Sequence, residues 1–210
     1  MTWLTRPGPD APDVVVVTGP AAETAQWDPD SRLHLSAYAP ALGPSGKPGL
    51  PLALGLGALL LDQAGYTGRR VLHTVADDEP AGACAALGAR LAVTAPRTAL
   101  LALGDGSARR GTTAPGYLDE RAVPFDTAVE LAVRAGDLAA LAAVDPGLAR
   151  ELMATGRPAW QVLAGALQHR TPQPGTLAPG RPHVSVLYAD GPFGVAYLVA
   201  VFTPATDRST

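Results

Sequence analysis

The sequence has few residues of the kinds that cross-link a chain or hold a metal: one cysteine, Cys84, and four histidines among 210 residues. A single thiol excludes a disulfide framework and a zinc site built on several thiolates. Cys84 lies in an alanine-rich helical pattern, where we expect a small buried side chain. The histidines show no H-x-H or H-x-x-x-H spacing, so we assign no metal ligand from spacing.

Neither sign of charge is in large excess, and long apolar runs are also scarce. The net charge is −3 at pH 7, and no basic run exceeds the pairs Arg69-Arg70 and Arg109-Arg110. Because a nucleic-acid-binding protein needs a basic face, we expect no nucleic-acid partner. No apolar run of about 18 residues, the length of a membrane span, occurs. The N-terminus also lacks the pattern of a signal peptide, so we expect no membrane contact and a cytoplasmic location.

What the sequence does have is alternating apolar segments of strand and helix length. Its length fits one domain, which we place at residues 1–210 with an ordered core at 13–203. Strands are predicted at 14–17, 71–75 and 98–103, and helices at 51–64 and 80–93. This alternation predicts an α/β fold with a mixed, largely parallel central sheet and helices on both faces.

The second half of the chain is predicted to be helical and then to end in a hairpin. Phe125, Val129, Ala132 and Val133 recur at helical spacing. Further helices are predicted at 137–144, 145–154 and 158–167, and hairpin strands at 184–188 and 195–202. Asp126 and its acidic neighbours in the first turn of the first helix are explained by capping and surface ion pairs.

The strand at 98–103 stops at a polar turn, Gly104-Asp105-Gly106-Ser107, which two arginines follow. Open α/β folds bind ligands at the carboxyl ends of their strands, so Asp105 and Ser107 are candidate catalytic residues. Arg109 and Arg110 are candidates for binding a small anion. The alternative is that the aspartate and serine only close the turn while the arginines are solvated.

A second polar cluster lies between the two hairpin strands and could face the same cleft. Asp190 is its candidate catalytic residue, and Tyr188 and Phe193 are candidate ligand-binding residues, as is Tyr117 after the first turn. Ser107 is an unlikely nucleophile in the usual sense, because it does not lie in G-x-S-x-G and has no evident histidine partner.

Six blocks in order carry a resemblance to a known family. They are VVVVTGP, LPLALGLGALLL, LALGDGSARR, APGYLDERAVPFD, AVRAGDLAALAAVDPGLARELMATGRPAWQVLAGAL and YADGPFGVAYLVAVF. Together they resemble actinobacterial proteins similar to the catalytic B subunit of class III extradiol dioxygenases, from Val14 to Phe202. The resemblance implies a mixed α/β sheet wrapped by helices and suits a homodimer. Active members hold Fe(II) with two histidines and a glutamate, open a catechol ring with O2, and use a further histidine as acid and base.

The chain lacks the histidines that the family has at three positions. The resemblance implies a histidine in an N-terminal His-Pro segment, which we expect to be missing here together with its strand. A second histidine is implied after Gly19-Pro20, where Ala21-Ala22 stands, and a third after the Gly-Asp-x-Ser turn, where Ala108 stands. Asp105, Ser107, Tyr188 and Asp190 match the frame of the family's pocket without its metal chemistry.

The leading hypothesis is therefore a divergent extradiol-dioxygenase-like protein without the usual Fe(II) site and without a cofactor. It would bind a small aromatic or anionic molecule in the cleft at the strand ends. One alternative is an active ring-cleaving dioxygenase, an oxidoreductase whose iron has atypical ligands such as His34 and Asp190. Another is a non-catalytic partner subunit that a second chain completes. Whether the protein is an enzyme stays open at this point.

Overall fold

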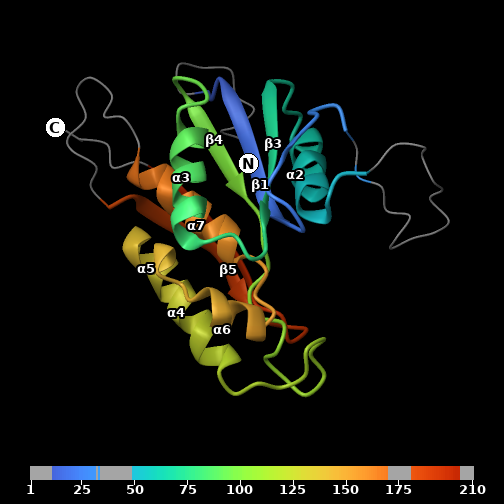
Figure 1. Ribbon diagram of the computed structural model, residues 1–210, viewed down its shortest axis with the longest axis vertical. Helices are drawn as coiled ribbons and strands as arrows, with labels where there is room; N and C mark the ends of the chain where they lie inside the picture. The colour runs from blue at the N-terminus through green and yellow to red at the C-terminus, as the bar shows by residue number, and fades with distance from the viewer. Residues whose placement is uncertain (1–10, 32, 34–48, 170–180, 204–210) are drawn as a thin grey trace.

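The computed structural model describes residues 11–31, 33, 49–169 and 181–203 (Figure 1). A four-stranded sheet contains β1 (Val14–Ala21), β2 (Gln26–Trp27), β3 (Arg69–Ala76) and β4 (Thr98–Ala102) in the order β2-β3-β1-β4. β1 is parallel to β3 and to β4, and β2 is antiparallel to β3. The predicted mixed, largely parallel sheet is confirmed. The two-residue β2 was not predicted, because its surroundings show little periodicity.

The valines of β1 are buried on both faces of the sheet. Val15 and Val17 pack in the core on the side of α2 (Leu52–Gln63), and Val14 and Val16 pack on the opposite side. On that side lie α3 (Ala81–Ala92) and α7 (Arg157–Gln168). Continuous β-branched runs are typical of parallel strands covered on both faces, so the sequence pattern and the layering agree. Cys84 is fully buried in the core on the α3 side, as expected.

The helices α3 and α7 approach one another until their backbones touch. A Cβ added to Gly88 of α3 would lie 2.0 Å from the carbonyl oxygen of Val162, and one added to Gly165 of α7 would lie 2.3 Å from that of Ala85. No side chain larger than hydrogen fits at either glycine without moving a helix. The position of α7 is therefore fixed against α3.

The second half of the chain builds a separate core. It comprises α4 (Ala122–Ala135), α5 (Leu138–Ala142), α6 (Pro146–Glu151) and the antiparallel hairpin of β5 (His183–Asp190) and β6 (Tyr197–Thr203). The predicted face of α4 packs against the inward side chains of the hairpin. α6 ends at Glu151 rather than near residue 154, since Met153 adopts φ +57°.

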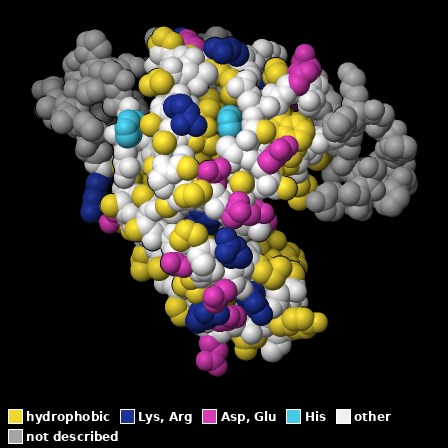
Figure 2. Space-filling model, in the orientation of Figure 1, with side chains coloured by type: hydrophobic (Ala, Val, Ile, Leu, Met, Phe, Trp, Pro, Cys, Tyr) yellow, Lys and Arg dark blue, Asp and Glu magenta, His cyan; other side chains and the backbone are white. Residues whose placement is uncertain are grey.

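Charges on the surface are mixed in sign. Figure 2 shows acidic and basic side chains interspersed over the visible face, in keeping with the small net charge of −3. Among the described residues, no helix combines the length and the apolar composition needed to span a bilayer.

Candidate functional site

The turn that follows β4 lies against the segment that leads into β6. Gly106 N–H donates to the Ala196 carbonyl (3.2 Å), Ala196 N–H to the Ser107 carbonyl (3.1 Å), and Arg110 N–H to the Gly194 carbonyl (3.2 Å). This contact requires a glycine at 106, because a Cβ there would lie 2.6 Å from the Ala196 Cβ. The two polar segments, far apart in the sequence, are thereby brought together.

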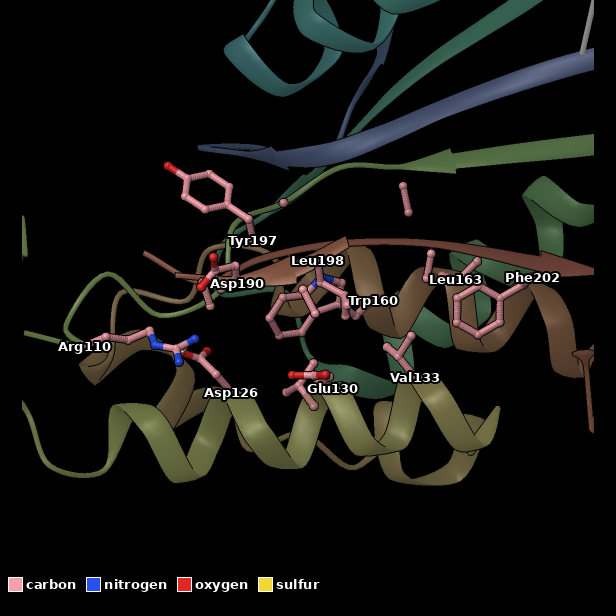
Figure 3. Close-up of a pocket in the computed structure, with 17 residues that line it drawn as sticks. Arg110, Asp126, Glu130, Val133, Trp160, Leu163, Asp190, Tyr197, Leu198 and Phe202 are labelled. Carbon is pink, nitrogen blue, oxygen red and sulfur yellow. Dashed lines mark ion pairs between the residues drawn. The ribbon is translucent and has the colours of Figure 1, made fainter. Parts of the chain in front are cut away.

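A pocket of about 270 Å³ lies beside this contact, between the end of β4, α4, α7 and the hairpin (Figure 3). Its lining comprises Ala102, Gly104, Gly106, Arg110, Asp126, Val129, Glu130, Val133, Trp160, Leu163, Ala189, Asp190, Ala196, Tyr197, Leu198, Ala200 and Phe202. In Figure 3 the side chains of Arg110, Asp126, Asp190 and Tyr197 gather at one end, while Val133, Leu163 and Phe202 lie at the other. The pocket thus has a polar end and an apolar end.

Asp126 and Ser107 form a buried pair at the polar end. Ser107 is fully buried and Asp126 is 7% exposed. The Ser107 backbone N–H donates to Asp126 Oδ1 (2.9 Å), and the Ser107 hydroxyl donates to Asp126 Oδ2 (2.5 Å). Each carboxylate oxygen therefore has a donor. The serine hydroxyl orients Asp126 and is not presented to the pocket as a nucleophile.

Arg110 lies next to this pair. Its Nη1 is 3.8 Å from Asp126 Oδ2, which is beyond hydrogen-bonding distance, and its side chain is 27% exposed. Burial raises the pKa of Asp126, while the Ser107 hydrogen bonds and the Arg110 charge oppose that increase. Burial is the largest cause, so Asp126 holds its proton to a higher pH than an exposed aspartate does.

The raised pKa of Asp126 predicts a pH dependence of stability. A carboxyl whose folded pKa exceeds its unfolded value of about 3.9 stabilises the fold below that value, and the contribution is lost as pH rises through the folded pKa. We expect wild type to lose stability relative to Asp126→Asn as the pH rises above about 4 and through the raised pKa of Asp126. Urea unfolding of both proteins at several pH values measures this difference, and a pH-independent difference would contradict the prediction.

The structure places some of the sequence candidates at the pocket and others away from it. Arg110 and Asp190 line the pocket, and Ser107 lies behind Asp126. Asp105 is exposed and contributes its carbonyl oxygen to the N–H of Gly156 (2.8 Å) instead of a side chain to the pocket.

The remaining candidates are not part of the pocket lining. Arg109 donates from Nη1 to the Glu151 carbonyl (2.8 Å), which turns it toward the end of α6. Tyr117, Tyr188 and Phe193 are 74%, 45% and 76% exposed. They are close in sequence to pocket residues, but Tyr117 and Phe193 lie in turns and Tyr188 lies on the outer face of β5, so all three side chains are directed to solvent.

Sequence reasoning missed Asp126 and Trp160 as pocket residues. Asp126 was interpreted as a surface residue of the first helical turn. A signal was present, because Asp126, Val129, Glu130 and Val133 recur at i, i+3, i+4 and i+7 and therefore share the inward face of α4. A carboxylate within an apolar stripe indicates a buried polar site.

The pocket residues do not fit the Fe(II) site that the family resemblance implies. Among the described residues, three carboxylates line the pocket, from Asp126, Glu130 and Asp190, but no imidazole does. Within the described ranges, no three His, Cys, Asp or Glu residues are grouped so as to hold a metal ion. His34, proposed as an atypical ligand, lies outside the described residues.

The fold and site define an α/β protein with a ligand-sized pocket at the carboxyl edge of a mixed sheet. No protein-family model matches the sequence, and no curated protein matches it. The fold is similar to the crystal structure of an uncharacterized protein from Escherichia coli K12, with a TM-score of 0.52 at 13% sequence identity. The match covers 90% of this chain and 85% of that one. At this identity the similarity concerns the fold alone.

Proposed function

We propose that this protein is a divergent extradiol-dioxygenase-like protein that binds a small aromatic molecule in the pocket and lacks the family's usual Fe(II) site. The observation that carries the proposal is the two-ended pocket. Trp160, Leu163 and Phe202 supply an apolar wall for a ring, and Arg110, Asp126 and Asp190 supply polar groups at the opposite end. Small-molecule sites are commonly apolar with a few polar groups that fix orientation.

The size of the pocket limits the ligand. Its 270 Å³ is close to the lower limit of about 300 Å³ for small-molecule sites, so a single substituted ring suits it better than a dinucleotide or a polycyclic compound. Ring cleavage by the family mechanism is not proposed, because the part of the pocket lining that the structure describes contains no imidazole to hold iron or to transfer the proton.

Binding of benzyl alcohol, a neutral ring probe, tests the proposal. For so few atoms we expect a dissociation constant in the millimolar range, measured by chemical-shift changes of backbone amides. Ala200→Leu places a larger side chain into the pocket and should weaken binding about tenfold. The matched control is Val199→Leu on the neighbouring residue of β6, which is 51% exposed and does not line the pocket. Equal affinity of the two variants would count against the proposal.

A further inference from the structure

We infer that the natural ligand is an aromatic carboxylic acid whose carboxylate binds Arg110 while its ring packs against the apolar wall. This inference rests on the proposed function and names the class of ligand for the same pocket. It follows from the unused donors of the Arg110 guanidinium, from the hydrogen bonds that hold Asp126 to Ser107, and from the charged groups around the pocket.

Arg110 has more donors than the described residues use. A guanidinium carries five N–H donors, and buried donors are normally hydrogen-bonded. The Arg110 side chain is about three-quarters buried, and a Cβ added to Gly191 would lie 3.0 Å from its Cζ, so the hairpin turn confines the group. Within the described part of the chain, its one ionic neighbour is Asp126 at 3.8 Å. The guanidinium therefore lies in the pocket with donors available to a ligand.

Asp126 does not take up those donors. Its two oxygens accept the Ser107 N–H and hydroxyl at 2.9 and 2.5 Å, and these two bonds come from one residue and hold the carboxyl group in place. Movement of Asp126 toward Arg110 would break them and leave the fully buried Ser107 donors unpaired, which is costly. A planar ligand carboxylate can instead approach the guanidinium and accept two parallel hydrogen bonds.

The surrounding charges favour a carboxylate over a phosphate or an amine. Glu130 is ion-paired with Arg134 (2.7 Å), and Asp190 Oδ1 accepts the Gly191 N–H (2.7 Å). Together with Asp126, these groups disfavour a second negative charge, so a singly charged anion is the one that a single guanidinium can neutralise. An amine would lie beside the Arg110 guanidinium, whose positive charge repels it.

The test compares three probes that share a ring and differ in charge: benzoate, benzyl alcohol and benzylamine. Wild type should bind benzoate about tenfold more tightly than benzyl alcohol, and benzylamine more weakly than either. Arg110→Gln should remove the advantage of benzoate while it changes benzyl alcohol binding by less than about twofold. The control Arg90→Gln makes the same charge change at an exposed position of α3, outside the pocket lining, and should leave all three affinities unchanged.

The outcomes separate the two proposals. If benzyl alcohol binds and benzoate shows no advantage, or if Arg110→Gln leaves benzoate affinity unchanged, the carboxylate inference is wrong and the proposed function stands. Preference for benzylamine overturns the inference in favour of a cationic ligand. If none of the three probes binds to wild type, the proposed function fails and the inference fails with it.

Discussion

Replacement of Arg157 by alanine is expected to lower the free energy of unfolding by about 3–5 kcal/mol. Arg157 is 1% exposed, yet it carries a full charge in the packed interior. Its Nη2 donates to the Asp77 carbonyl (2.5 Å), and its Nη1 donates to the Glu79 carbonyl (2.5 Å) and to Gln161 Oε1 (3.0 Å). One side chain on α7 thus holds the turn between β3 and α3.

The network extends beyond the arginine. Gln161 Nε2 donates to the carbonyls of Ala142 (3.0 Å) and Val144 (2.9 Å), so the two side chains link α7 both to the sheet edge and to the end of α5. Alanine at 157 would remove a donor from the Asp77 carbonyl and from the Gln161 oxygen, and it would leave the Glu79 carbonyl with the weak donor of the Cys84 thiol (3.7 Å). It would also leave a cavity the size of an arginine side chain. Unpaired acceptors in partly buried positions and cavities each cost free energy, and here they occur together.

Urea unfolding at neutral pH measures this loss. Arg157→Lys should retain part of the stability, because one ammonium group keeps the charge but cannot match the fork of the guanidinium. Arg134→Ala is the control: it removes an exposed i,i+4 ion pair with Glu130 and should cost less than about 1 kcal/mol. A loss below about 1 kcal/mol in Arg157→Ala would show that the buried network contributes little.

The parts of the fold that local chemistry determines could be predicted from the sequence. The run of four valines predicted β1 because β-branched side chains suit a strand buried on both faces. Asp137 and Asp145 were placed at helix starts, and their side chains accept hydrogen bonds from the N–H groups of Ala140 and Leu148. The terminal hairpin followed from turn chemistry between two apolar segments.

The candidate site was predictable in location but not in composition. The strand end at Gly104 pointed to the edge of the sheet at which the pocket lies, because that inference needs only strand direction. Which side chains face inward there depends on tertiary packing. Arg110 faces the pocket whereas its neighbour Arg109 turns to α6, and no local pattern distinguishes them. Arg157 shows the same limit, since a lone arginine at a helix start is normally exposed.

The second large effect concerns the contact between α3 and α7. Gly88→Ala in α3 should lower the free energy of unfolding by about 3 kcal/mol. Gly82→Ala in the same helix should raise it by up to about 1 kcal/mol. A Cβ at Gly88 would meet the Val162 carbonyl oxygen at 2.0 Å and the Ala166 nitrogen at 2.7 Å, both backbone atoms of α7. At Gly82 no atom of the described residues outside the local helix backbone lies within 4 Å of the added Cβ. Alanine there only reduces the freedom of the unfolded chain and improves helix propensity.

Gly88→Ala should also affect ligand binding in the pocket. α7 carries Trp160 and Leu163 into the pocket lining, so a displacement of α7 from α3 moves the apolar wall. We expect Gly88→Ala, under conditions where it remains folded, to weaken benzyl alcohol binding severalfold, and Gly82→Ala to leave it unchanged. Urea unfolding and amide chemical-shift titration of the two variants check both effects. Equal stabilities would show that α3 and α7 separate without cost, and the rigid placement of the pocket wall would then have to be abandoned.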